Sequence, residues 1–64
     1  MKVRDVINIL EEDGWYQVRM RESHRQFHHR TKRGTVTLAG HPGADVPPGI
    51  LKAIWRQAQL DEKL

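Results

Sequence analysis

The sequence predicts a small α+β domain in which two helices cover one face of a three-stranded antiparallel sheet. Three observations support this fold class. Apolar residues recur with helical spacing near both ends of the chain, three segments between them alternate like strands, and short polar turns separate those segments. Each predicted element has only one apolar face, so the simplest packing has two layers, with both helices on the same side of the sheet. The predicted order is α-β-β-β-α, in a single domain that spans residues 1–64.

The first predicted helix lies near the start of the chain and ends at Gly14. Its apolar residues follow the i, i+3, i+4, i+7 spacing of one helix face: Val3, Val6, Ile7 and Leu10. Glycine readily adopts the left-handed conformation found just beyond a helix C-terminus, which makes Gly14 the expected end. Residues 11–13 are all acidic and lie at the negative end of the helix dipole, and we interpret them as ordinary surface charge.

Three short strands are predicted between the helices, over residues 15–20, 24–29 and 35–38. Strand-forming residues are frequent in these segments, and they are joined by a polar turn at 21–23 and a loop at 30–34 that ends in glycine. Tight connections of this kind join neighbouring antiparallel strands into a meander.

The period of two distributes side chains between the two faces of each predicted strand. In the first strand, one face would carry Tyr16, Val18 and Met20, and the other Trp15, Gln17 and Arg19. In the second, one face would carry His24, Gln26 and His28, and the other Arg25, Phe27 and His29. With both helices on one side of the sheet, the opposite face is polar and free to meet solvent or a ligand.

The second helix is predicted after an irregular segment, residues 39–49, which is rich in proline and glycine. Pro47 and Pro48 precede or open this helix, where proline costs least. Its apolar stripe consists of Ile50, Leu51, Ile54, Trp55 and Ala58. Residues 61–64 are expected to fray.

The composition limits the location and the chemistry of the protein. There is no cysteine, which excludes disulfides and thiolate zinc sites and fits a reducing cytoplasm, where we expect the protein. No apolar run approaches the ~20 residues that a membrane-spanning helix needs, so no membrane partner is expected.

Basic charge is concentrated between Arg19 and Arg33. This stretch holds six of the eleven Lys and Arg residues and one of the eight acidic residues, so its formal charge is +5 and that of the remainder −2, against +3 for the whole chain. Three of the four histidines also lie in it: His24, His28 and His29. A basic strip that carries titratable imidazoles predicts a polyanionic partner such as nucleic acid.

The residues of this strip disfavour several kinds of catalytic site. His28 and His29 point to opposite faces of a strand, and His24 and His28 are too far apart for easy chelation, so we expect no metal. The sequence shows no serine–histidine–acid arrangement and no glycine-rich phosphate loop before a helix. Paired carboxylates are absent from the strip, and no cofactor is expected.

One strand histidine among arginines remains, and such a group can suffice for the cleavage of RNA. RNA carries its own nucleophile, since the 2′-OH attacks the neighbouring phosphorus when protons are moved and negative charge is stabilised. Imidazole titrates near neutral pH and suits the proton transfer, whereas arginine matches phosphate oxygens. DNA lacks the 2′-OH and would not be cut in this way.

A set of landmarks in the chain resembles the HicA-like toxins, also called YcfA-like. In order, these are Gly14-Trp15, Ser23-His24 with Phe27 three positions on, Gly40-His41-Pro42, and Pro48-Gly49 opening a helix that contains Ile54. The resemblance covers nearly the whole chain. It implies a fold like that of the double-stranded-RNA-binding domain and an endonuclease that acts on mRNA. It also implies a toxin whose active surface is covered by a HicB-like antitoxin, with the family's catalytic histidine at His24.

We therefore predict a metal-independent ribonuclease toxin in which His24 is the general acid or base. The residues predicted to contact RNA are Arg21, Ser23, Arg25, Lys32 and Arg33. The chain departs from the family at Glu22, where the family has a glycine that would allow a positive φ or a close approach of RNA. Glu22 would repel phosphate and reduce activity, or would instead accept a proton or orient His24.

Two other functions remain open at this point. The chain could be a non-catalytic module like a double-stranded-RNA-binding domain, which would bind RNA in a salt-sensitive way without cutting it. It could also be a domain that binds only proteins, which would show no affinity for RNA at low salt.

Overall fold

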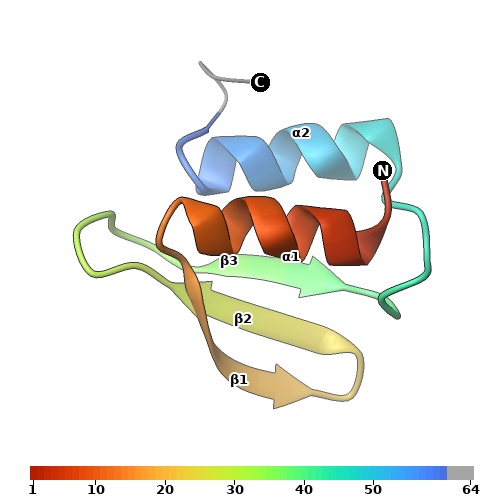
Figure 1. The fold of residues 1–64 in the computed structure, drawn as a ribbon, viewed down its shortest axis with the longest axis horizontal. Coiled ribbons are helices and arrows are strands. Elements are labelled where there is room, and N and C mark those ends of the chain that lie inside the picture. Colours follow the sequence, from red (N-terminus) through yellow and green to blue (C-terminus); the bar gives the residue numbers. More distant parts are fainter. Residues whose placement is uncertain (61–64) are drawn as a thin grey trace.

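The computed structural model describes residues 1–60 as two helices and three strands. Their order is α1 (Val3–Glu12), β1 (Tyr16–Arg21), β2 (His24–His28), β3 (Val36–Ala39) and α2 (Pro48–Gln57). The central strand β2 pairs antiparallel with both β1 and β3, and the helices form a second layer against the sheet (Figure 1). The α+β fold class and the α-β-β-β-α order are thus confirmed. The fraying expected at 61–64 concerns residues outside the described part of the chain.

A single apolar core lies between the sheet and the two helices. Its members are Val3, Val6 and Leu10 of α1, Phe27 of β2, Val36 and Leu38 of β3, Ile54 and Trp55 of α2, and Trp15, Val46, Ala58 and Leu60 from the connecting segments. Because Phe27 is fully buried and its strand neighbour His28 is exposed, the helices cover one face of β2 and leave the other bare. The prediction that both helices pack on the same side of the sheet is confirmed.

Both helices begin where local chemistry favours it. In α1 the Asp5 carboxylate accepts a hydrogen bond from the backbone N–H of Lys2 at 3.2 Å, which satisfies a donor at the N-terminus. In α2 the fixed φ of Pro48 suits the first helical position, as predicted. Within residues 1–60, neither helix is long and apolar enough to cross a membrane.

We call the sheet surface turned away from the helices the open face. The strand register assigns to it Tyr16, Arg19 and Arg21 of β1, His24, Gln26 and His28 of β2, and Thr37 and Ala39 of β3. This confirms the predicted grouping of His24, Gln26 and His28 on the side opposite Phe27.

The register of β1 contains a β-bulge at Val18. Tyr16 pairs with His28 and Arg19 pairs with Gln26, and the register shifts between these two pairs. Directly paired residues of antiparallel strands point to the same side of a sheet. Tyr16 and Arg19 therefore share the open face although three residues separate them in sequence, and Val18 is the additional residue that makes this possible.

The bulge makes one prediction wrong, because alternation along β1 is interrupted. Met20 was predicted to share a face with Tyr16, but it pairs with Arg25 on the helix side of the sheet. Arg19 was predicted on the opposite face, but it shares the open face with Tyr16. Arg21 pairs with His24 and lies on the open face. Alternation in the sequence of one strand cannot reveal a β-bulge, because the additional residue is defined only by the pairing with the neighbouring strand.

The loop between β2 and β3, residues 29–35, is held against the end of α1 by His29. The Nε2 atom of His29 lies 2.7 Å from the backbone oxygen of Asp13, and Nδ1 lies 3.1 and 3.2 Å from the backbone nitrogens two and three residues further on. A carbonyl accepts and a backbone N–H donates, so Nε2 carries the proton and Nδ1 is the acceptor. The ring also meets the Trp15 indole edge-on, with centroids 5.2 Å apart.

Gly14 makes this arrangement possible. The helix ends at Glu12, and Gly14 has a φ of +104°, which confirms its predicted role as the residue beyond the C-terminus. A Cβ atom at this position would lie 2.8 Å from Nε2 of His29. Glycine is therefore required both by the backbone conformation and by the packing of the histidine ring.

Candidate functional site

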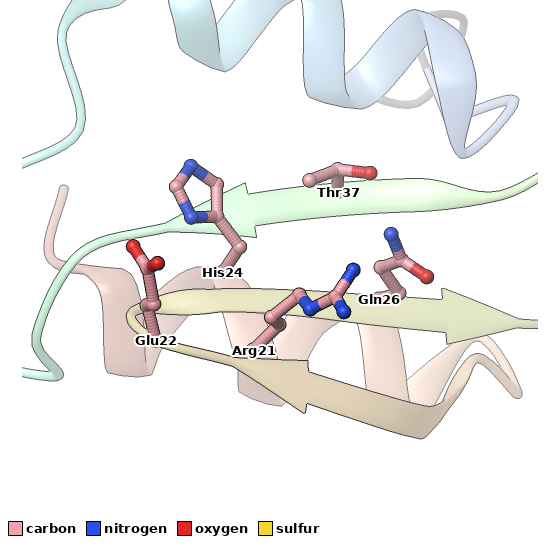
Figure 2. Close-up of a pocket in the computed structure, with 5 residues that line it drawn as sticks. All are labelled: Arg21, Glu22, His24, Gln26 and Thr37. Carbon is pink, nitrogen blue, oxygen red and sulfur yellow. The ribbon is translucent and has the colours of Figure 1, made fainter.

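A shallow pocket of about 340 Å³ lies on the open face, where β1 turns into β2. It is lined by Arg21, Glu22, His24, Gln26 and Thr37. Figure 2 shows these side chains on one side of the sheet, with the guanidinium of Arg21 extended along β2 toward Gln26 and the Glu22 carboxylate rising beside the His24 ring. The pocket thus offers charged and hydrogen-bonding groups from all three strands and from the turn.

The hairpin between β1 and β2 sets the position of the two residues with the clearest chemistry. His24 is the first residue of β2 and pairs directly with Arg21, the last residue of β1. The Cβ atoms of directly paired residues are about 4.5–5.5 Å apart. His24 also pairs with Ala39 of β3, so the imidazole stands on a strand that is held from both sides.

The turn at Glu22 and Ser23 has an unusual backbone. The φ of Glu22 is +56°, which matches the requirement of a two-residue hairpin loop for a positive φ at its first position. The left-handed region costs a residue with a side chain about 1–2 kcal/mol, whereas glycine adopts it freely. The backbone N–H of Gly40 donates to the Ser23 carbonyl at 3.1 Å and fastens the turn to the end of β3.

The charged groups of the pocket have no partners among residues 1–60. Arg21, Glu22 and His24 are exposed, and none of them forms a side-chain hydrogen bond or ion pair with the described part of the chain. The site therefore holds a cation, an anion and an imidazole that all face the same open space.

A family model described as the HicA toxin of bacterial toxin–antitoxin systems matches residues 3–60. The chain belongs to the HicA toxin family. The matched residues include all five helices and strands and every residue that lines the pocket. None of the curated proteins with which the chain was compared matches it.

In this HicA-family chain, the residues predicted to contact RNA lie in different places. Arg21 lines the pocket with His24. Ser23 is in the adjoining turn but does not line the pocket, and its carbonyl is bonded to Gly40. Arg25 lies on the helix side of the sheet, where its Nη1 is 3.6 Å from the sulfur of Met20. The structure therefore brings Arg21 to His24 and turns Arg25 away from it.

Lys32 and Arg33 lie in the β2–β3 loop, at the other end of β2 from His24. The ammonium of Lys32 forms an ion pair with Asp13 and donates to the backbone oxygens of Ala58 and Gln59 at 3.1 and 3.3 Å. Lys32 therefore connects the loop to the ends of both helices. The Arg33 side chain is exposed, and its backbone carbonyl accepts a hydrogen bond from the Gln59 side chain at 3.3 Å.

Three pocket residues were absent from the predicted set of catalytic and RNA-contact residues: Glu22, which was noted only as a departure from the family, Gln26 and Thr37. Gln26 was placed on the same predicted strand face as His24, and that alternation was the signal that could have included it. Thr37 could be assigned to the pocket only from the pairing of β3 with β2, which sets it directly opposite Gln26. Across residues 1–60, no three His, Asp or Glu side chains are close enough together to hold a metal ion.

Proposed function

We propose that this HicA-family chain is an RNA endonuclease that cuts mRNA, with His24 transferring protons and Arg21 binding the scissile phosphate. The observation that carries this proposal is the direct pairing of His24 with Arg21 on the open face, with both side chains exposed. A proton-transfer group and a phosphate ligand thus stand side by side on a surface that a polynucleotide can reach.

The chemistry follows from the substrate. The 2′-oxygen of one ribose attacks the adjacent phosphorus, a 2′-O–P bond forms, and the bond from phosphorus to the 5′-oxygen of the next nucleotide breaks. The products are a 2′,3′-cyclic phosphate and a free 5′-OH. A proton leaves the 2′-OH and another reaches the 5′-oxygen, and His24 carries out one of these transfers.

Arg21 would stabilise the negative charge that grows on the phosphate oxygens. Its guanidinium is permanently charged and matches two oxygens at once. Since the nucleophile belongs to the RNA, the reaction needs no cofactor and no metal ion to generate one.

Glu22 would lower the activity of this chain. Its carboxylate lines the pocket beside His24, where it repels the phosphate that Arg21 attracts. This residue also favours the second candidate function, that of a non-catalytic module which resembles a double-stranded-RNA-binding domain and binds RNA without cutting it. Both candidates would bind RNA in a salt-sensitive way, so affinity does not separate them. Only the nuclease would release cleaved RNA.

The partner of such a toxin would be a HicB-like antitoxin that covers the open face in the cytoplasm. An occupant of this surface blocks the pocket and the access of RNA together, because both lie on the same side of the sheet. Antitoxin and RNA are therefore expected to compete.

Incubation of the purified protein with RNA, in the presence and absence of EDTA, tests the proposed function. Cleavage that survives EDTA and leaves 2′,3′-cyclic phosphate ends is the expected result. His24→Ala should remove about 10²–10⁴-fold of the rate, as expected for loss of a general acid or base. His41→Ala is the matched control, because His41 is an exposed loop histidine that does not line the pocket. Binding without cleavage would support the non-catalytic module, and equal rates for His24→Ala and wild type would refute the role of His24.

A further inference from the structure

We propose that the open face binds the bases of a single RNA strand along β2, with Gln26 and Thr37 contacting one base and Tyr16 and His28 stacking another. This inference rests on the proposed function, because it extends from the pocket where the RNA would be cut. It assigns roles to residues beyond His24 and Arg21, and it names the form of RNA that this surface accepts.

The register arranges the open face in three rows across the sheet. The first row holds Arg21, His24 and Ala39, the second Arg19, Gln26 and Thr37, and the third Tyr16 and His28. Successive rows are two residues apart on β2, which corresponds to about 7 Å. A strand of RNA that begins at His24 and follows β2 would therefore pass each row in turn.

The second row has the chemistry for contact with a base edge and with a phosphate. The Gln26 amide and the Thr37 hydroxyl supply donors and acceptors, and neither side chain has a hydrogen-bond partner within residues 1–60. They are directly paired, so both reach the same point above the sheet. Arg19 occupies the β1 side of the same row and is exposed, where its charge suits the RNA backbone.

The third row offers aromatic surface. Tyr16 is 46% exposed, a large value for an aromatic side chain that the fold does not use in its core. It pairs directly with His28, whose Nε2 lies 3.2 Å from the Thr35 hydroxyl. Bases that are not paired stack on exposed tyrosine and histidine rings, largely independently of sequence.

These contacts suit a single strand and not a duplex. In a duplex the bases are stacked on one another inside the helix, so their faces are covered, and only their minor-groove edges and the 2′-hydroxyls are displayed to a protein. Gln26, Thr37 and Tyr16 project from a sheet surface and not from an inserted helix. Tyr16 can stack on a base face only when the base is splayed from the strand, and only an unpaired base offers its Watson–Crick edge to Gln26 and Thr37.

Binding measurements with the catalytically disabled His24→Ala protein test this inference. Fluorescence anisotropy would compare a labelled single-stranded RNA with the same RNA annealed to its complement. We expect the single strand to bind at least tenfold more tightly. Equal or tighter binding of the duplex would refute the inference.

Tyr16→Ala in the same background should weaken single-strand binding about tenfold, because a stacked base is lost. Tyr16→Phe should retain the affinity, since the ring face is preserved. Met20→Ala is the matched control, because Met20 lies on the same strand and is 52% exposed but faces the helix side. Similar losses for Tyr16→Ala and Met20→Ala would contradict the assignment, and circular dichroism would show that both variants are folded.

Gln26→Ala in the active protein provides a separate readout. Sequencing of the ends produced from a randomised RNA should show a changed base preference next to the cleavage site, with cleavage still detectable. An unchanged preference would refute the role of Gln26 in base contact. The two proposals can fail separately. If the wild-type protein binds single-stranded RNA as expected but does not cut it, the nuclease alone is refuted. If it cuts RNA but Tyr16→Ala does not weaken binding and Gln26→Ala does not change the base preference, the base contacts alone are refuted.

Discussion

Arg21 and His24 are directly paired across the β1–β2 hairpin, as the last residue of one strand and the first of the next. Only Glu22 and Ser23 separate them in sequence, so the loop is too short to allow their spacing to change. A shift of register by one residue would move one of the two side chains to the helix side of the sheet. The relation between the phosphate ligand and the proton-transfer group is thus a property of the backbone pairing.

Arg21→Ala is expected to slow RNA cleavage about 10²–10³-fold, because one preorganised donor to the developing charge is removed. Arg21→Lys should recover part of this loss, since lysine keeps the charge but not the planar pair of donors. Single-turnover cleavage at saturating protein measures the effect. Arg4→Ala, on the exposed side of α1, should leave the rate unchanged. A rate for Arg21→Ala equal to that of Arg4→Ala would show that Arg21 does not act on the phosphate.

Glu22→Gly should both stabilise the protein and raise its cleavage rate. Glycine relieves a φ of +56°, and after allowance for the greater freedom of the unfolded chain we expect a gain of up to about 1 kcal/mol in the free energy of unfolding. Glu22→Gln separates the two effects, because it removes the charge and keeps the backbone strain. Both variants should cut RNA faster than wild type. Slower cleavage by both would mean instead that the Glu22 carboxylate accepts a proton during the reaction.

The neighbouring residues His28 and His29 should differ sharply in their effect on stability. The His29 side chain is 11% exposed, bonded to Asp13 and to the loop backbone, and packed against Trp15. His29→Ala should therefore cost about 2–4 kcal/mol, whereas His28→Ala, on the open face, should cost less than about 1 kcal/mol. Urea denaturation compares the two directly. Equal losses would mean that His29 does not hold the loop.

Lys32→Met should affect stability and leave RNA binding nearly intact. The ammonium is engaged with Asp13 and with two carbonyl oxygens at the end of α2, so its removal should cost about 1–2 kcal/mol. Arg33→Met, one residue further along, should change stability by less than about 0.5 kcal/mol.

In salt titrations of RNA binding, Arg21→Met should reduce the slope of log K against log salt by about 0.7, but Lys32→Met should not. A reduced slope for Lys32→Met would place that side chain on RNA.

The parts of the fold and site that depend on local sequence could be predicted. Apolar spacing predicted both helices, Gly14 marked the end of the first, and alternation in β2 separated His24 from Phe27. The features that the sequence could not show depend on partner strands and contacts elsewhere in the chain, such as the pairing with β2 that sets the face of Met20. Lys32 was predicted to meet RNA because its charge is visible in the sequence, whereas its contacts with Asp13 and Ala58 join residues 19 and 26 positions away.

The bulge in β1 has a further consequence, which concerns contacts between molecules. β1 is an edge strand whose outer backbone groups are unpaired by the sheet, and Val18 and Met20 on it are 43% and 52% exposed. A regular strand of this kind would be a template for the strand of a second molecule. The extra residue distorts the edge, and Arg19 and Arg21 would oppose like charges in a second copy. Deletion of Val18 would keep Tyr16, Arg19 and Arg21 in alternation while straightening the strand. We expect such a variant to aggregate at a lower protein concentration than the wild-type chain, as measured by light scattering during concentration.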